Sequence, residues 1–491
     1  MDRKMKILLI VALFLSSTAT AQMHYTVSVD TPYYHVQLNA GGIATDSVLF
    51  KMPVWTPGYY QLMNYAEQVY HFSARDTAGN TLPFEKRAPN GWMVYTGKNT
   101  SIILEYDVKS TRPFVAANFL SKDRGYISPA GMFMHISGQI KQRVTLVIKR
   151  LPGWNLATSL YQEKGKEGFY AVDFDILYDS PILMGKLEEL PDFKVGGIPH
   201  YFVAYNAGEF DQLQFIKDLQ KIVQAGVDVI GEVPYTHYTF LAIGPGGGGI
   251  EHLNSASISF NGAGLQTREG KIRIYNFLAH EYFHHYNVKR IRPIELGPFD
   301  YDNGSKTRLL WISEGFTVYY EYLMVKRAGL TTPEDVYKAL STNIRAYESK
   351  PGRLEQSVAA ASYETWADGP FGRSGGVSYY DKGPVIGAML DLKIRHETNN
   401  KRSLDDVMRA LYQQYYKQAG RGFTEAEFRT VCEKIAGVEL TELFEYANTV
   451  KPLDYRKYFG YAGLELTADF ELKPITQPNA LQIAILKDWL R

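Results

Sequence analysis

Two histidines and a glutamate in residues 276–293 have the spacing of a metal site. The segment reads NFLAHEYFHHYNVKRIRP and contains the pattern His-Glu-x-x-His at positions 280–284. Residues four apart lie on the same face of an α-helix, so the imidazoles of His280 and His284 can reach one ion. Glu281, beside them, is expected to take a proton from a metal-bound water. The pattern indicates hydrolysis by a metal-activated water.

A third metal ligand is expected at Glu314, within the apolar run LWISEGF that is typical of a second buried helix. Two histidines and one glutamate leave a fourth zinc position open for water or substrate, as in a catalytic site. His285 is a poor third ligand, because it points roughly 100° away from His284 around a helix. We therefore expect one zinc ion per chain, and a chance pairing of histidines on an amphipathic helix is the alternative.

The segments HEYFHHYNVKRIRP and WISEGFTVYYEYL resemble the glycyl aminopeptidase family. This family is a branch of the gluzincin metallopeptidases, which also include thermolysin and the alanyl-type aminopeptidases, and the resemblance extends over most of the chain. It implies zinc-dependent removal of N-terminal residues, small ones such as Gly or Ala, from peptides. In the related aminopeptidases the glutamate seven residues past the third ligand supports a zinc histidine. Glu321 has this position, and an ordinary surface charge is the alternative.

The glycine-rich segment before the zinc pattern resembles a second family motif. Alanyl-type enzymes carry Gly-x-Met-Glu-Asn on a strand at the cleft edge, and residues 248–252 match it with Ile for Met and His for Asn. The resemblance implies that Glu251 pairs with the free α-amine of the substrate. Gly248 and Gly249 would let the substrate backbone approach closely. From spacing alone, the four glycines at 246–249 are equally consistent with a flexible hairpin loop.

Tyr380 begins the sequence Tyr-Asp-Lys-Gly, which resembles the alanyl-type motif whose tyrosine stabilises the oxyanion. The resemblance gives Tyr380 this role. Tyr379 is the neighbouring alternative, and packing against the following helix is the common role of tyrosines in such a place.

Two other segments have a structural and a functional interpretation. Residues 52–60, MPVWTPGYY, are similar to part of the family's N-terminal domain, and we expect a structural turn there, with substrate contact as the alternative. Lys289, Arg290 and Arg292 follow the zinc pattern. Such charges are usually solvated, although near a cleft they could hold a substrate carboxylate or organise the loop that leads to Glu314.

The chain of 491 residues is too long for one hydrophobic core. Residues 22–195 contain short β-branched and aromatic runs between turns, which predicts an all-β domain. Residues 196–459 show mainly helical periodicity, interrupted by two strand-like pieces. We expect a multi-domain α+β protein, in which the β domain precedes a thermolysin-like, mainly helical zinc peptidase domain. Residues 460–491 are too few for the PDZ domain that many members of the resembled family carry.

Residues 1–21 have the pattern of a signal peptide, with basic residues, an apolar run at 7–15 and Ala-Thr-Ala before Gln22. Nine apolar residues are too few to span a bilayer, so we expect an exported periplasmic or extracellular protein without stable membrane insertion. The formal charge of +1 gives no argument for a nucleic-acid partner, and the oligomeric state stays open. Cys432 is the only cysteine, which excludes an intrachain disulfide.

Peptides are therefore the expected substrates, and three other functions are alternatives. An endopeptidase would use the same zinc chemistry without needing Glu251 to meet a free amine. Another metallohydrolase could direct the activated water at a different acyl or epoxide bond. A non-catalytic binding protein is disfavoured, because Glu281 accompanies all three ligands.

Overall fold

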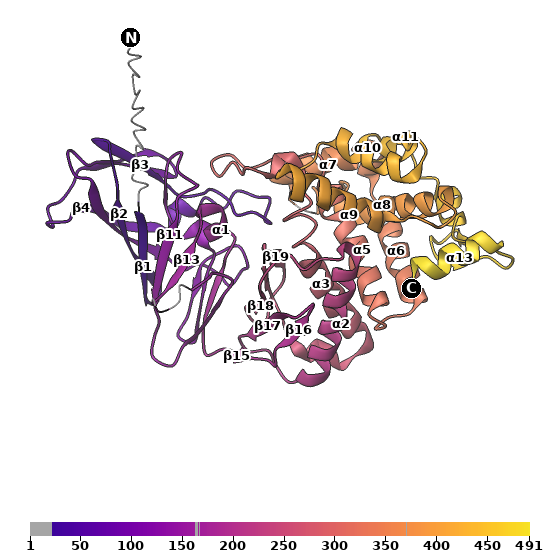
Figure 1. Ribbon diagram of the computed structural model, residues 1–491, viewed down its shortest axis with the longest axis horizontal. Helices are drawn as coiled ribbons and strands as arrows, with labels where there is room; N and C mark the ends of the chain where they lie inside the picture. The colour runs from indigo at the N-terminus through magenta and orange to yellow at the C-terminus, as the bar shows by residue number, and fades with distance from the viewer. Residues whose placement is uncertain (1–21, 163–164, 166, 370) are drawn as a thin grey trace, which may run out of the picture.

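The computed structural model describes residues 22–162, 165, 167–369 and 371–491. The expected signal peptide lies outside these residues. Strands dominate the first part of the chain and helices the second, and the two parts lie side by side (Figure 1). The expected order, an all-β domain followed by a mainly helical domain, is confirmed.

Three sheets form the first part of the chain. The largest has the strand order β13-β11-β1-β2-β7-β4, and the other two have the orders β10-β3-β6-β5 and β12-β14-β9-β8. In β2 and β7 every second side chain is buried, as expected for strands with one face on a core. The elements are β1 (Gln22–Asp30), β2 (Tyr33–Gly41), β3 (Ser47–Lys51), β4 (Val69–Asp76), β5 (Phe84–Ala88), β6 (Gly91–Tyr95), β7 (Ser101–Lys109), β8 (Phe119–Leu120), β9 (Arg124–Ile127), β10 (His135–Ile136), β11 (Val144–Lys149), β12 (Asn155–Thr158), β13 (Phe169–Ala171), α1 (Phe174–Tyr178) and β14 (Ile182–Gly185).

A further sheet belongs to the second part and has the order β15-β17-β18-β20-β19, with β16 also paired to β17. Its strands are β15 (Glu188–Glu189), β16 (Phe193–Val195), β17 (Ile198–Ala204), β18 (Tyr238–Ala242), β19 (Gly249–Glu251) and β20 (Ser255–Ile258). β15 and β16 both pair with β17, so residues 188–195 belong to the sheet of the second part. We had expected the second part to begin at residue 196.

Helices make up most of the remaining chain. They are α2 (Gln212–Ile230), α3 (Arg268–Phe283), α4 (Leu310–Ser313), α5 (Gly315–Arg327), α6 (Pro333–Glu348), α7 (Val358–Asp368), α8 (Tyr379–Glu397), α9 (Leu404–Leu411), the π-helix Tyr412–Ala419, α10 (Glu425–Ala436), α11 (Thr441–Asn448), α12 (Tyr455–Gly460) and α13 (Ala480–Trp489). The short strands β21 (Leu464–Leu466) and β22 (Leu472–Pro474) pair near the end of the chain. Within the described residues, no helix is both long and apolar enough to cross a membrane.

The zinc pattern lies at the end of α3. The Thr267 hydroxyl accepts a hydrogen bond of 3.0 Å from the Gly270 amide and caps the start of this helix, a contact worth about 1 kcal/mol. Regular helix ends at Phe283, earlier than the proline at 293 suggested, and His284 keeps helical backbone angles as the C-cap. Both histidines therefore lie on one face.

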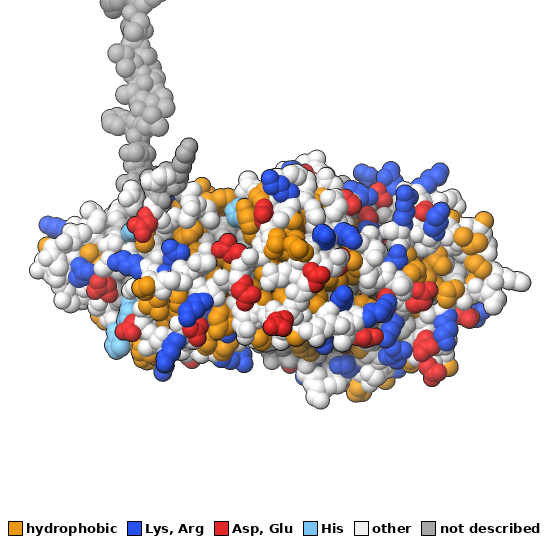
Figure 2. Space-filling view, turned by 90° about the horizontal axis from the view of Figure 1, so that it is seen from below, with side chains coloured by type: hydrophobic (Ala, Val, Ile, Leu, Met, Phe, Trp, Pro, Cys, Tyr) orange, Lys and Arg blue, Asp and Glu red, His pale blue; other side chains and the backbone are white. Residues whose placement is uncertain are grey.

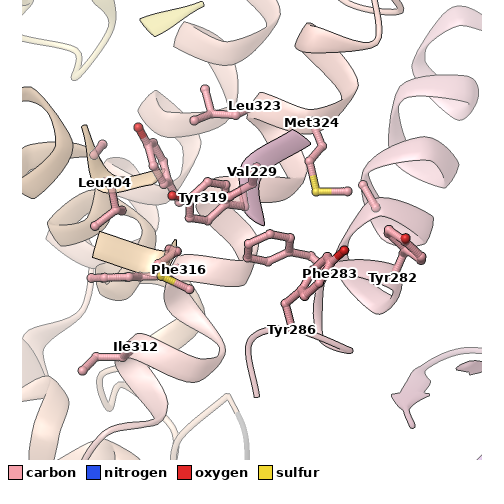
Figure 3. Close-up of a cluster of buried hydrophobic side chains, with 14 of the residues drawn as sticks. Val229, Tyr282, Phe283, Tyr286, Ile312, Phe316, Tyr319, Leu323, Met324 and Leu404 are labelled. Carbon is pink, nitrogen blue, oxygen red and sulfur yellow. The ribbon is translucent and has the colours of Figure 1, made fainter. Parts of the chain in front are cut away.

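A buried apolar cluster fixes α3 against α5. Tyr282 and Phe283 of α3 and Phe316, Leu323 and Met324 of α5 meet in this cluster (Figure 3). The cluster contains side chains that each contribute roughly 1.5–3 kcal/mol when fully buried, so the two helices that carry the predicted ligands are held firmly together.

The surface carries both signs of charge. On the face in Figure 2, Lys and Arg side chains are interspersed with Asp and Glu, in keeping with a net charge of +1. This face shows no extended region of one sign that would attract a polyanion.

Candidate metal centre and cleft

The three predicted ligands meet at one point. Nε2 of His280 lies 2.9 Å from Nε2 of His284, and Oε2 of Glu314 lies 3.2 Å from His284 Nε2 and 3.6 Å from His280 Nε2. Ligand atoms arranged tetrahedrally around zinc at about 2.0–2.1 Å stand roughly 3.3 Å apart, so these atoms fit a single ion. In the described part of the chain, this is the one group of three His, Cys, Asp or Glu side chains that could hold a metal.

Hydrogen bonds orient both imidazoles. His284 Nδ1 lies 2.7 Å from the carbonyl oxygen of Asn287, and His280 Nδ1 lies 2.9 Å from Oε2 of Glu321. A carbonyl and a carboxylate accept, so Nδ1 carries the proton in each ring and the Nε2 lone pair faces the other ligands. Glu321 therefore lies at a ligand histidine and not on the open surface.

Asn287 links the two helices and was missed by the sequence analysis. Its side-chain amide donates to the carbonyl oxygens of Ile312 and Ser313 at 3.0 and 3.1 Å. These carbonyls directly precede Glu314, so Asn287 holds the break between α4 and α5 from which the third ligand projects. Asn287 and Ile312 are 25 positions apart in the sequence, and no motif indicates this contact.

Glu281 is buried beside the ligands. Its Oε2 has no hydrogen-bond partner among the described residues. Burial raises the pKa of Glu281 to about 7 in the metal-free protein, and the nearby Glu251 and Glu314 carboxylates add to this shift. A bound dication would lower this pKa again. The free oxygen gives a proton acceptor next to the position where a metal-bound water would stand.

Gly249 in β19 packs directly against Glu281. A Cβ added to Gly249 would lie 2.2 Å from Oε1 of Glu281, so a larger residue here would have to displace the Glu281 carboxylate. This contact explains the last residue of the glycine run, Gly249, which begins β19 next to the predicted base.

We expect Gly249→Ala to displace the Glu281 carboxylate and lower kcat/KM by about tenfold or more, since small misplacements of catalytic groups are costly. Zinc content, measured by elemental analysis, should stay near that of the wild type. Gly247→Ala is the matched control, because a Cβ there meets no atom within 4 Å. Equal activity of the two variants would show that the Gly249 contact does not position the base.

A cleft of about 970 Å³ opens over these residues. Its floor includes His280, Glu281 and Gly249, and its walls come from both parts of the chain, with Gly58–Gln61 and Phe114 on one side and helices α3, α5, α6 and α8 on the other. Such a volume suits a small ligand or a short peptide segment.

Glu251 ends β19 with a side chain that is only 3% exposed. Its Oε1 has no hydrogen-bond partner in the described part of the chain, and its Oε2 would lie 2.8 Å from a Cβ added to Gly58. A buried carboxylate oxygen without a hydrogen-bond partner is costly, which favours a cationic ligand at this point. The next residue, His252, turns to Asp179, with Nδ1 at 3.1 Å from Oδ1.

The structure separates the two candidate tyrosines. The Tyr379 hydroxyl is 3.0 Å from that of Thr365, and Tyr379 is buried and is not one of the residues that line the cleft. Tyr380 lines the cleft, and its ring centre is 6.2 Å from that of His280. Burial raises the Tyr380 pKa well above its usual value, followed by the effect of the Glu314 carboxylate, so the hydroxyl stays protonated. The geometry favours Tyr380 as an oxyanion donor.

Two glycines bring Tyr380 close to Glu314. A Cβ on Gly315 would lie 2.5 Å from Cα of Gly383, so the start of α5 and the first turn of α8 touch through their backbones. Larger residues at either position would force these helices apart. The glycines of the Ser-Glu-Gly and Tyr-Asp-Lys-Gly sequences are therefore packing requirements of the site.

The cationic segment after the zinc pattern is neither solvated nor directed at the cleft. Lys289 Nζ lies 2.7 Å from Oδ1 of Asp179, and Arg290 Nη1 donates to the carbonyl oxygens of Leu253 and His285 at 2.8 and 2.7 Å. The expectation of a surface segment was wrong for these two residues. Lys289 thereby joins the second part of the chain to the first, while Arg290 holds the β19–β20 turn and the end of the zinc pattern. Asp179 was not singled out in the sequence.

Residues 52–60 form more than the expected structural turn. Gly58, Tyr59 and Tyr60 line the cleft, which is the alternative interpretation given above. This role could not be predicted from the sequence, because more than 200 residues separate the segment from the zinc pattern.

Comparison with known protein families gives two matches. Residues 24–186 match the Peptidase M61 N-terminal domain, and residues 273–386 match the M61 glycyl aminopeptidase domain. Together the matched ranges span more than half of the chain. A search of curated protein sequences gives no match.

Solved structures with a similar fold are aminopeptidases and zinc metallopeptidases. The aminopeptidase N family protein from Idiomarina loihiensis is 24% identical with a TM-score of 0.85, over 90% of this chain and 78% of that one. The M1 zinc metallopeptidase from Deinococcus radiodurans, in a structure with a Tyr-Ser-Ala substrate, is 13% identical with a TM-score of 0.53, over 89% and 95%. Aminopeptidase A of Legionella pneumophila is 13% identical with a TM-score of 0.52, over 87% and 49%. At these identities the likeness establishes the fold.

Proposed function

Because the chain belongs to the M61 glycyl aminopeptidase family, we propose that its cleft removes the first residue from peptides with a free α-amine, with a preference for Gly or Ala. The family and the three ligands make the protein a zinc metallo-aminopeptidase. The observation that carries the finer proposal is the buried Glu251 side chain, whose Oε1 has no hydrogen-bond partner among the described residues and which lies on the same strand as Gly249, the residue packed against Glu281.

The Glu251 carboxylate is suited to bind an ammonium group. A carboxylate and an ammonium form a charge-assisted hydrogen bond that is about twice as strong as a neutral one. The backbone of Gly58 lies against the same carboxylate. A substrate whose amine reached Glu251 would therefore meet the loop 52–61, which favours cleavage after one residue over cleavage inside a chain.

Different residues of the cleft have different roles in the reaction. His280, His284 and Glu314 would hold zinc, which supplies an electrophile for the scissile carbonyl and acidifies a water. Glu281 takes the proton of this water at its free oxygen and returns it to the leaving amine. The Tyr380 hydroxyl donates a hydrogen bond to the carbonyl oxygen as negative charge develops there.

The walls of the cleft favour a substrate whose first residue is small. Tyr60 and Tyr380 line the same cleft as His280 and Glu281, so aromatic rings form part of its wall. A large first side chain would compete with these rings for space. The family supplies the choice of Gly or Ala.

The zinc-loaded protein should release the first residue from unblocked Gly- and Ala-peptides faster than from Leu-peptides. Chelator treatment should abolish this release, and added Zn²⁺ should restore it. We would measure the freed amino acid by chromatography. Equal rates for all three peptides would overturn the small-residue preference, and activity that survives metal removal would overturn the zinc mechanism.

We also propose that the chain is exported, on the basis of the signal-peptide pattern in residues 1–21. Terminal sequencing of the protein recovered from the periplasm or the medium should then begin at Gln22. Retention of residues 1–21 in the recovered protein would contradict cleavage.

A further inference from the structure

A proline inside helix α8 deprives one backbone carbonyl of its usual partner. In an α-helix each carbonyl oxygen accepts a hydrogen bond from the N–H of the residue four positions later. Pro384 lies inside α8 and has no N–H, so the carbonyl oxygen of Tyr380 cannot be bonded within the helix. Tyr380 is also the residue whose side chain lines the cleft as the candidate oxyanion donor. Its carbonyl needs a donor from elsewhere in the structure.

Asn343 of α6 supplies the missing donor. Its Nδ2 donates to the carbonyl oxygen of Tyr380 at 3.2 Å, and its Oδ1 accepts a hydrogen bond of 3.0 Å from the hydroxyl of Tyr322 in α5. A carbonyl oxygen only accepts, so the amide nitrogen of Asn343 must face Tyr380 and its oxygen Tyr322. Asn343 is buried. One buried amide therefore joins α5, α6 and α8, which pack against one another (Figure 1).

Both backbone groups of Tyr380 are held by side chains. Its N–H donates to the Ser378 hydroxyl at 3.2 Å, which caps the start of α8, and its carbonyl oxygen accepts from Asn343. The side chain follows the backbone, and a shift of about 1 Å in a catalytic group can cost about a hundredfold in rate. Tyr322 and Tyr380 are among the described residues that line the cleft, and Asn343 is not. Asn343 therefore acts from behind the cleft wall.

We propose that Asn343 is a positioning residue for the oxyanion donor, because it replaces the hydrogen bond that Pro384 removes and so fixes the backbone of Tyr380. The proposal rests on the role of Tyr380 in the proposed function. It is independent of the preference for Gly or Ala and of amine binding by Glu251.

The first variant is Asn343→Leu in the full-length, zinc-loaded protein, which keeps a similar side-chain volume and removes both hydrogen bonds. We expect kcat for an unblocked Ala-peptide to fall about tenfold, because the first turn of α8 loses its anchor. KM should stay within about threefold of the wild-type value, since Glu251 is unchanged. Zinc content should also stay the same, because Asn343 is not one of the three clustered ligands. Asn343→Ser, which is too short to bridge the helices, replaces Asn343→Leu in every measurement if that variant does not fold.

A second variant restores the lost hydrogen bond in another way. Pro384→Ala returns an N–H to α8 that can donate to the Tyr380 carbonyl within the helix. The double variant Asn343→Leu, Pro384→Ala should therefore recover kcat to within about threefold of Pro384→Ala alone. A general loss of packing around Asn343 would not be repaired by a new N–H in α8.

Tyr380→Phe shows whether Asn343 acts through the Tyr380 hydroxyl. Loss of one oxyanion donor typically lowers kcat by about a hundredfold or more, and we expect this of Tyr380→Phe. Asn343→Leu added to Tyr380→Phe should then lower kcat by less than about twofold further, because the group that it positions is already absent.

Ser341→Ala is the matched control on the same helix. The Ser341 hydroxyl is buried and accepts a hydrogen bond of 3.0 Å from the amide of Leu472. Ser341 lies about 200° around α6 from Asn343, on the side away from Tyr380. This variant also loses a buried hydrogen bond of α6, and its kcat should equal that of the wild type.

Three results would overturn the proposal. A kcat of Asn343→Leu within about twofold of the wild-type value would show that the contact does not position Tyr380. A full further loss in the Tyr380→Phe background would place the effect of Asn343 on another group. Failure of Pro384→Ala to restore kcat would assign the loss to packing. Each of these is distinct from a failure of the proposed function, which would appear as wild-type kcat in Tyr380→Phe or as no release of the first residue by the wild type.

Discussion

Exchange of Glu281 for glutamine is expected to lower kcat by at least about a hundredfold while zinc content stays at the wild-type level. Glutamine has nearly the same shape as glutamate, but it cannot accept and return a proton as a carboxylate does. General acid–base groups typically contribute 10²- to 10⁴-fold to the rate. The buried Oε2 of Glu281 has no hydrogen-bond partner among the described residues, so the exchange breaks no hydrogen bond at this atom.

The measurement combines steady-state kinetics with metal analysis of the same preparation. His284→Ala serves as the contrasting variant, because it should lose zinc and activity together. Near-normal turnover of zinc-loaded Glu281→Gln would remove Glu281 from the mechanism.

The second large effect is expected from Glu251→Ala, which should reduce kcat/KM for unblocked peptides by about tenfold to a hundredfold. Hydrogen bonds to charged groups contribute roughly 1.5–3 kcal/mol, and each 1.4 kcal/mol corresponds to a factor of ten. Truncation leaves the substrate ammonium without a partner in a site that is shielded from water. Zinc content should not change, since Glu251 is not one of the three clustered ligands.

Acetyl-blocked peptides give the internal control for this variant. They lack the ammonium, so the wild type and Glu251→Ala should both cleave them poorly and to the same extent. If Glu251→Ala instead leaves the rates on unblocked peptides unchanged, the glycine-rich strand has no part in amine recognition, and the endopeptidase alternative gains support.

The metal ligands could be predicted because their geometry is largely local. His280 and His284 are one helical turn apart, and Glu314 lies in an apolar run that predicts a buried helix. The structure brings the three atoms together as the spacing suggested. Glu251 and Tyr380 depended on a resemblance, since nothing in a short strand or a helix start specifies which side chain faces a cleft.

Contacts between the two parts of the chain could not be predicted in this way. Lys289 was expected at the surface, because a cationic run is usually solvated, yet Asp179 pairs with it inside the molecule. Buried charges need partners, and the partner lies more than 100 residues away in the sequence.

The domain boundary shows a related limit. β15 and β16 are two and three residues long, and their sequences carry no signal for the strand that they join. Their pairing with β17 places them in the sheet of the helical part, although composition grouped them with the preceding strands. Pairing partners of short strands are fixed by the tertiary structure.

One measurement tests the central claim most directly, namely kcat/KM of the zinc-loaded protein on matched pairs of free and N-acetylated Gly-, Ala- and Leu-peptides. If Glu251 anchors the α-amine, each free peptide should be cleaved at its first bond at least about tenfold more efficiently than its acetylated partner. Equal cleavage of free and acetylated peptides, or cleavage at internal bonds, would contradict the aminopeptidase assignment.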